Sequence, residues 1–269
     1  MKFAHAGSAA RMVVAALAFA SAAAGPDASA ADRATTIEKV RGSVVAIGTF
    51  DKTRSPQFQF LGTGFVVGDG TLVATNAHVL PPLLDPARRE TIAILLPGAA
   101  KDGSPKDDVQ AREARQIAVD PAVDLALLKV NGAPLPALRI GESDNVKEGQ
   151  DVLFTGFPIG AVLGPFPVTH RGMVSVVTPI AIPQGRAADL DPATVRRLST
   201  GSFPVFQLDA TAYPGSSGSP VYNPDTGEVV GVINMVLVRS TKESVLSQPS
   251  GITYAVPARH LKSLLDKAR

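Results

Sequence analysis

The sequence predicts an all-β protein, a sandwich or barrels, built from two strand-rich halves. Many short apolar runs follow one another with Gly, Pro and Asp between them, which is typical of all-β folds. The regular alternation of strands and helices that indicates a parallel sheet is missing from the sequence. The irregular stretch 131–145 divides the runs into two groups, and we expect it to separate two barrels.

Residues 1–30 are expected to be a cleaved signal peptide rather than part of the fold. Two basic residues, Lys2 and Arg11, precede the apolar run 12–24, and Ala28-Ser29-Ala30 follows as a small-x-small cleavage site. A membrane-spanning helix needs about 20 apolar residues, and this run is shorter. Export of a chain without cysteine suits the bacterial envelope, so we expect a periplasmic or secreted protein.

A short helix and a series of strands are expected after the leader. Residues 35–40 could form one or two helical turns, with Thr35 at the cap position. Each strand-like run is short, apolar and bounded by turn residues. In order, the runs are 43–48, 64–67, 71–75, 91–96, 125–130, 151–155, 172–177, 204–208, 228–234 and 252–256.

Two further segments have distinct patterns. The stretch 183–203 is rich in Arg and Asp, and we expect a surface loop with one helical turn around 191–198. Residues 257–268 predict a C-terminal helix, because apolar residues recur on one face and Pro257 suits an early helical position. The residues on that face are Leu261, Leu264 and Leu265.

The composition excludes several classes of function. There are 26 basic and 24 acidic residues, and the formal net charge of +2 indicates neither a nucleic-acid partner nor an anionic membrane. The absence of cysteine excludes disulfides, thiolate metal sites and cysteine nucleophiles. No metal-ligand cluster, phosphate loop or haem motif is visible, so we expect no metal and no cofactor.

Three short motifs stand in the order His, Asp, Ser. They are Thr75–Leu80 (TNAHVL), Asp120–Val130 (DPAVDLALLKV) and Pro214–Pro220 (PGSSGSP). Each has an ordinary alternative explanation when taken alone. A histidine in an apolar stretch is often a core or surface residue, an acid before a strand is often a turn residue, and a Gly/Ser cluster is usually a turn.

Nucleophilic catalysis explains why the three motifs belong together. A serine hydroxyl becomes a strong nucleophile when an imidazole accepts its proton, and the imidazole needs a carboxylate on its other nitrogen. Backbone N–H groups must also point at the developing oxyanion, and the glycines around Ser217 allow the tight turn that this requires. An α/β-hydrolase nucleophile elbow is excluded, because Ser219 stands where that motif needs glycine.

The three motifs, in this order, resemble the chymotrypsin-fold serine proteases, and the chain is most similar to bacterial HtrA/DegP-type proteases. Further stretches such as 62–65 (GTGF) and 251–257 (GITYAVP) match, so the likeness covers roughly residues 36–260. The resemblance implies two six-stranded antiparallel β-barrels with a short C-terminal helix. Barrel 1 would span about 36–135 and barrel 2 about 140–256.

The resemblance also assigns roles to individual residues. His78 would be the general base, Asp124 the carboxylate that orients it, and Ser217 the nucleophile. The amides of Gly215 and Ser217 would form the oxyanion hole. Asp120 is the nearby rival to Asp124, which we prefer because it directly precedes the apolar strand.

Several features depart from the family pattern or lie outside it. Ser216 and Ser219 stand where the family more often has Asn and Gly, and neither change removes a catalytic group. The chain ends at Arg269, whereas relatives of this type usually continue into PDZ domains, which bind peptide C-termini. His170 and His260 have basic neighbours, and we expect both to face solvent.

The resemblance places a substrate pocket on two sides of the nucleophile. Thr211 and Ala212 would form one side, and Val236 and Leu237 the other. A preference for Lys or Arg would need an acid at position 211, and a glutamyl preference would need a histidine where Ile233 stands. Burying an unpaired charge is costly, so we expect cleavage after Val, Ala, Leu or Ile.

The expected function is therefore a secreted or periplasmic serine endopeptidase that hydrolyses unfolded or damaged polypeptides. The alternative from another class is a catalytically silent homologue that binds polypeptides as a chaperone-like module. We expect polypeptide substrates, no nucleic acid and no stable membrane insertion after signal cleavage. A homo-oligomer is left open, because Phe50, Phe58 and Phe60 could form a subunit contact or pack on the barrel.

Overall fold

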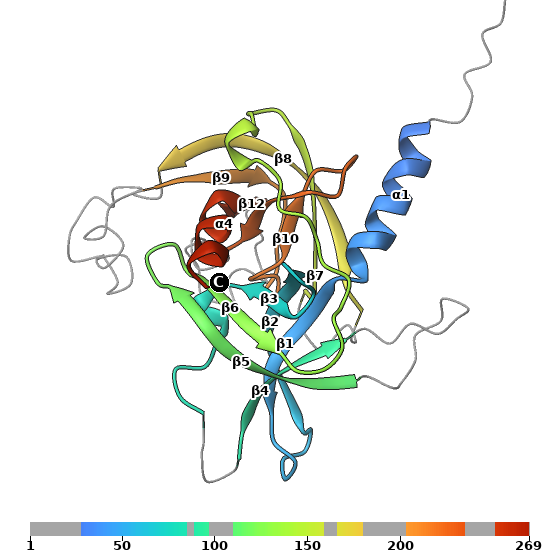
Figure 1. Cartoon of the computed structure of the whole chain (residues 1–269). Coiled ribbons are helices and arrows are strands. Elements are labelled where there is room, and N and C mark those ends of the chain that lie inside the picture. The colour runs from blue at the N-terminus through green and yellow to red at the C-terminus, as the bar shows by residue number, and fades with distance from the viewer. Residues whose placement is uncertain are drawn as a thin grey trace, which may run out of the picture.

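The chain forms two closed antiparallel barrels of six strands each, one following the other in the sequence (Figure 1). This computed structural model describes residues 28–84, 89–96, 110–158, 166–179, 203–234 and 251–268, with residues 28–31 and 110 described by backbone alone. The predicted all-β fold with two six-stranded barrels and a short C-terminal helix is confirmed.

The first barrel closes because β1 pairs with both β2 and β4, in the spatial order β1-β2-β3-β6-β5-β4. Its strands are β1 (Val44–Phe50), β2 (Phe58–Val67), β3 (Leu72–Thr75), β4 (Thr91–Leu96), β5 (Gln110–Asp120) and β6 (Leu125–Val130). Every strand expected in this half is present. β5 was not expected, because its sequence QAREARQIAVD mixes charged residues into the apolar pattern.

The second barrel closes where β10 pairs with β7, in the order β10-β11-β12-β9-β8-β7. Its strands are β7 (Asp151–Gly156), β8 (Val168–Pro179), β9 (Pro204–Asp209), β10 (Pro220–Tyr222), β11 (Val229–Ile233) and β12 (Ile252–Pro257). The three-residue β10 was not expected. The predicted loop at 183–203 lies almost wholly outside the described residues, and its helical turn lies entirely outside them.

Strands β1, β3 and β6 of the first barrel are buried on both faces, which explains their continuous apolar runs. In β1, Val45 and Ile47 belong to the barrel's own core, whereas Val44 and Ala46 pack in a cluster shared with the second barrel. Burying one such side chain contributes about 1.5–3 kcal/mol. The shared cluster therefore fixes one barrel against the other, and the candidate site lies at this junction.

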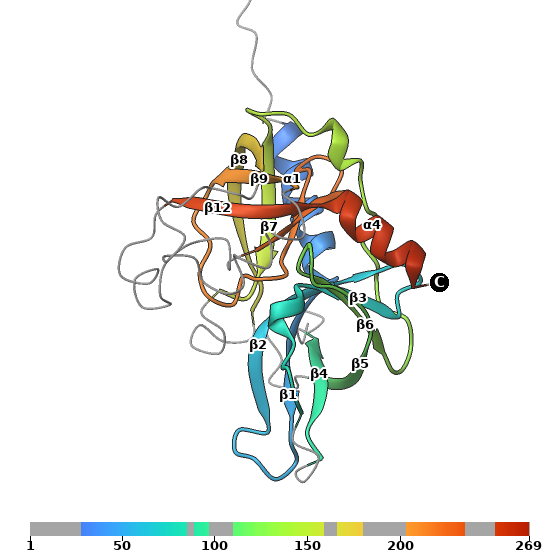
Figure 2. The ribbon, with the colours of Figure 1, turned by 90° about the vertical axis from the view of Figure 1, so that its left-hand side faces the viewer.

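Two helices pack against the barrels (Figures 1 and 2). The N-terminal helix α1 (Ala28–Arg41) places Ile37 and Val40 on the shared core. It is longer than the one or two turns expected at 35–40, because the alanine-rich residues before Thr35 favour helix. The C-terminal helix α4 (Ala258–Lys267) matches its prediction closely, burying Leu261 and Leu264 against the shared core, and contacts β6 and β11.

Phenylalanine side chains near the N-terminus pack on the first barrel. Phe50 and Phe58 are paired across β1 and β2, and Phe60 contacts Phe157 edge to face at 6.4 Å. Phe60 thus packs on the cluster shared by the two barrels. Within the described ranges, no helix is long and apolar enough to span a membrane.

Candidate active site

His78 lies in a single turn of 3-10 helix, η1 (Ala77–Val79), directly after β3. The turn is held by backbone bonds, with the amide of Ala77 donating to the carbonyl of Asp124 at 3.1 Å. The His78 side chain is 28% exposed, so its ring lies between the protein interior and solvent. This position lets the imidazole contact both a buried group and an incoming substrate.

Asp124 lies in the turn that directly precedes β6, a strand that pairs with β3 and β5. Its backbone adopts φ +56°, an uncommon conformation for a residue other than glycine. The carbonyl of Asp124 accepts hydrogen bonds from the Ala77 amide and from Asn76 Nδ2 at 3.1 Å, and these contacts hold the turn. The strained conformation directs the carboxylate toward the imidazole of His78.

The carboxylate of Asp124 accepts three hydrogen bonds. Its Oδ1 accepts the backbone N–H of His78 at 2.9 Å, and its Oδ2 contacts His78 Nδ1 at 2.6 Å. Asn234 Nδ2, from the second barrel, donates to the same Oδ2 at 2.8 Å. Because a carboxylate only accepts, the proton of the imidazole lies on Nδ1, which leaves Nε2 free to accept.

Ser217 is the third residue of the hydrogen-bonded group that contains Asp124 and His78. Its Oγ lies 2.9 Å from His78 Nε2, in a loop between β9 and β10. Ser217 is buried, with 7% of its surface exposed to solvent. The structure thus brings together three residues that are far apart in sequence, from both barrels. Asp120 is not among them: its Oδ1 accepts the amide of Ala122 at 3.1 Å within its own turn.

The expected oxyanion loop has the backbone geometry of a tight turn. Gly215 has φ +99° and Gly218 has φ +86°, conformations that favour glycine. Between them, the Ser216 amide donates to the carbonyl of Tyr213 at 2.9 Å. Across the described part of the chain, the amides of Gly215 and Ser217 have no acceptor, so both remain available to a substrate oxygen.

Asn234 was not predicted from the sequence. It is the polar residue at the end of the apolar run of β11, and it is 1% exposed. Its position at the end of a buried strand was the available signal, since a buried amide needs hydrogen-bond partners. The side chain carries a hydrogen bond from the second barrel to Asp124 in the first, so it joins the two halves of the site.

The expected substrate-pocket residues are only partly described. Thr211 is half-buried, and Ala212 is buried with its amide donating to Thr253 Oγ1 at 3.1 Å. Thr253 Oγ1 in turn donates to the carbonyl of Ala210 at 2.6 Å, which ties this segment to β12. Val236 and Leu237 lie outside the described residues.

The prediction that His170 and His260 face solvent is wrong. His170 stacks on Phe154 at 4.9 Å, and His260 meets Phe203 edge to face at 4.8 Å. In both rings Nε2 is buried without a hydrogen-bond partner in the described ranges, and burial lowers the pKa of each histidine below its usual value. Successive side chains of β8 point to opposite faces, so Arg171 points to solvent and His170 points inward. A basic neighbour therefore does not indicate that a histidine is exposed.

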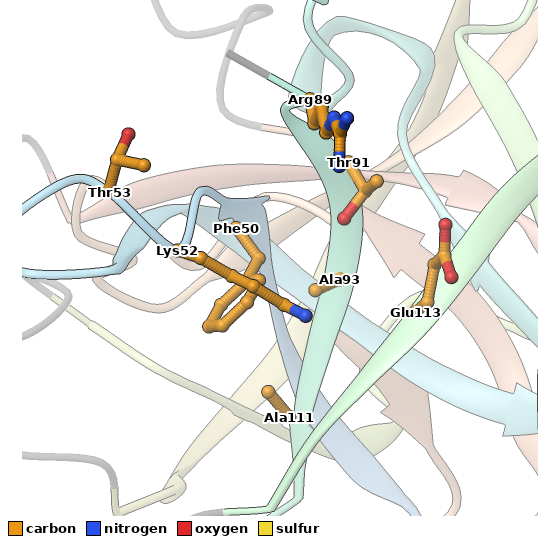
Figure 3. Close-up of a pocket in the computed structure, with 8 residues that line it drawn as sticks. All are labelled: Phe50, Lys52, Thr53, Arg89, Thr91, Ala93, Ala111 and Glu113. Atoms are coloured by element: carbon orange, nitrogen blue, oxygen red, sulfur yellow. The ribbon is translucent and has the colours of Figure 1, made fainter.

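A hollow in the described part of the protein lies away from these residues. It has a volume of about 760 Å³ and lies on the first barrel where β1, β4 and β5 meet (Figure 3). Its lining contains no residue predicted for catalysis, and consists of Phe50, Lys52, Thr53, Arg89, Thr91, Ala93, Ala111 and Glu113. Across the described ranges, no group of three His, Asp or Glu side chains is placed to hold a metal.

Two closed antiparallel barrels, with hydrogen-bonded Asp, His and Ser side chains at their junction, define the class of chymotrypsin-fold serine endopeptidases. Comparison with known proteins then gives the family. Residues 62–232, well over half of the chain, match the trypsin-like peptidase domain, and the chain belongs to this family.

Individual relatives agree with this placement. The chain is 32% identical over 210 residues to a "Probable periplasmic serine endoprotease DegP-like" of Marinomonas sp. (strain MWYL1), covering 78% of this chain and 35% of that protein. A protein of the same description from Pseudomonas fulva (strain 12-X) is 31% identical over 217 residues, covering 80% and 36%. The chain thus spans about a third of the length of these curated relatives.

A solved structure shows the same fold. It is an HtrA-type protease with a tripeptide, which aligns with a TM-score of 0.58 at 22% identity and covers 87% of this chain and 62% of that one. The resemblance to HtrA/DegP-type proteases inferred from the motifs is therefore confirmed.

Proposed function

We propose that this chain is an endopeptidase of the bacterial envelope that cleaves unfolded or damaged polypeptides through an acyl-enzyme. His78 is the general base, Asp124 its orienting carboxylate and Ser217 the nucleophile. The observation that carries the proposal is the continuous set of contacts from Asp124 Oδ2 to His78 Nδ1 (2.6 Å) and from His78 Nε2 to Ser217 Oγ (2.9 Å). Both distances are within the reach that proton transfer requires.

In the first step, Ser217 Oγ forms a bond to the carbonyl carbon of the scissile peptide while its proton moves to His78 Nε2. The carbonyl oxygen takes up the electron pair and accepts hydrogen bonds from the amides of Gly215 and Ser217. Asp124 accepts the hydrogen bond from Nδ1–H and stabilises the imidazolium. The C–N bond then breaks, and His78 gives its proton to the leaving amine.

In the second step, water replaces the amine. His78 accepts a proton from the water as its oxygen bonds to the acyl carbon, and the same two amides stabilise the second oxyanion. Collapse breaks the bond to Ser217 Oγ, which recovers its proton from His78. The cycle consumes one water for each peptide bond.

The location in the envelope rests on the signal-peptide pattern of residues 1–30 and on relatives named as periplasmic. Expression of the full chain in a bacterium, with mass determination of the mature product, tests it. The expected product begins close to residue 31. A mature chain that keeps residues 1–30 would contradict the assignment.

Degradation of unfolded casein tests the chemistry. Replacing Ser217 or His78 by Ala should lower turnover by about five to six orders of magnitude, with a smaller loss at Asp124. The Ser217→Ala chain should still fold, which circular dichroism checks. Activity of Ser217→Ala within tenfold of the wild type would overturn the assignment of the nucleophile.

A further inference from the structure

Thr63, in β2, holds the loop that carries Ser217 through both its backbone and its side chain. It is fully buried. Its amide donates to the carbonyl of Ser217 at 2.9 Å, and its Oγ1 donates to the carbonyl of Gly215 at 2.7 Å. These carbonyls belong to the two residues whose amides are proposed to bind the oxyanion. One residue of the first barrel therefore holds both ends of the loop 215–217, Ser217 through its backbone amide and Gly215 through its hydroxyl.

The direction of the Thr63 hydroxyl follows from its partners. The amide of Phe157 donates to Thr63 Oγ1 at 3.0 Å, and an amide cannot accept a proton. The carbonyl of Gly215 can only accept, so the single hydroxyl proton points at Gly215. The carbonyl of Thr63 accepts from Thr75 Oγ1 at 2.7 Å, so the polar groups of this buried residue are all paired.

Within the loop itself the restraints are backbone hydrogen bonds, among them the Ser219 amide donating to the carbonyl of Ser216 at 3.0 Å. Ser216, its middle residue, is 1% exposed, and its Oγ has no hydrogen-bond partner in the part of the chain that the structure describes. The amide of Ser216 is held by the carbonyl of Tyr213, but its side chain restrains nothing. The Gly215–Ser216 peptide group is therefore held on both sides, by the hydrogen bond from its N–H to Tyr213 and by the hydrogen bond from Thr63 Oγ1 to its carbonyl.

We propose that Thr63 is a positioning residue for the oxyanion hole, which holds the loop so that the amides of Gly215 and Ser217 converge on one oxygen. This inference rests on the proposed protease function. Thr63 does not touch the reacting atoms. It acts by fixing two carbonyl groups, so its loss should affect the transition state more than the binding of substrate.

Kinetics of three variants test the proposal. Thr63→Val keeps the shape but loses both hydrogen bonds of the hydroxyl, and should lower kcat by about 10- to 100-fold with KM changed by less than about threefold. Thr63→Ser keeps the hydroxyl and should restore most of kcat. Thr155→Val is the matched control, because Thr155 is equally buried and its hydroxyl pairs with Thr169 and Tyr222 rather than with a residue of the loop 215–217.

Hydrogen–deuterium exchange gives a readout that does not depend on turnover. Exchange across residues 213–219 should be faster in Thr63→Val than in wild type, and unchanged in Thr155→Val. The proposal would be overturned if kcat were the same in Thr63→Val and wild type. It would also be overturned if kcat fell by the same factor in Thr63→Val and Thr155→Val. If the wild-type chain shows no turnover, the proposed protease function is contradicted. In that case hydrogen exchange still tests Thr63, because unchanged exchange in Thr63→Val would overturn its role in holding the loop.

Discussion

Substitution of Gly218 by Ala tests whether the nucleophile loop is held against the first barrel as closely as its geometry indicates. A Cβ at Gly218 would lie 2.0 Å from the carbonyl oxygen of Thr63 and 2.5 Å from Thr75 Oγ1. Cβ atoms essentially never approach within 3.0 Å, so the loop must move by about 1 Å. A misplacement of about 1 Å in an active site can cost about 100-fold in rate.

Gly149 provides a matched control, because the two glycines have nearly the same positive φ but differ in surrounding space. Gly218 has φ +86° and Gly149 has φ +84°, and a Cβ at Gly149 would meet nothing within 4 Å. Alanine in this conformation costs about 1–2 kcal/mol at either position. The displacement of the catalytic serine should occur only with Gly218→Ala.

The assay compares peptide hydrolysis and urea unfolding of the two variants with wild type. Gly149→Ala should lose about 1–2 kcal/mol of stability and keep kcat within about twofold. Gly218→Ala should lose more stability and about 100-fold in kcat/KM. If the two variants are equally active, the loop is not confined as the structure indicates, and the reasoning is refuted.

Three further predictions follow from the described contacts. Asn234→Ala removes a hydrogen bond to the Asp124 carboxylate worth about 1.5–3 kcal/mol, so kcat/KM should fall about 10- to 100-fold in steady-state assays; a loss below twofold would show that the bond does not support catalysis. Burial lowers the pKa of His170, so the unfolded chain binds protons more readily and the free energy of unfolding should decrease as the pH falls below about 6.5. His170→Phe should flatten this dependence in urea unfolding, and an unchanged slope would contradict it. Cut sites mapped by mass spectrometry in a denatured protein should follow Val, Ala, Leu or Ile, and a majority after charged residues would show that the aliphatic pocket is wrong.

The strand pattern was predictable wherever strands are buried on both faces. The continuous apolar runs of β4 and β6 mark those strands to the residue, because side chains on both faces enter a core. β5 escaped prediction since charged residues on its exposed face interrupt the apolar pattern, and β10 is too short to show any period.

The candidate site was predictable only where a residue stands in a recognisable motif. His78, Asp124 and Ser217 each do, and the structure brings them within hydrogen-bond distance. The contacts of Asn234 and Thr63 depend on how one barrel packs on the other, and that information is absent from local sequence. The same limit applies to His170, whose burial follows from the face of β8 on which it lies.

The central claim is that Ser217 is a nucleophile activated by His78. Its most direct test is labelling of the folded chain with a fluorophosphonate, which modifies activated serines, followed by mass spectrometry of the digested protein. The account predicts a single adduct on the peptide that contains Ser217, absent in Ser217→Ala and strongly slowed in His78→Ala. An adduct on another residue, or labelling of His78→Ala at the wild-type rate, would contradict it.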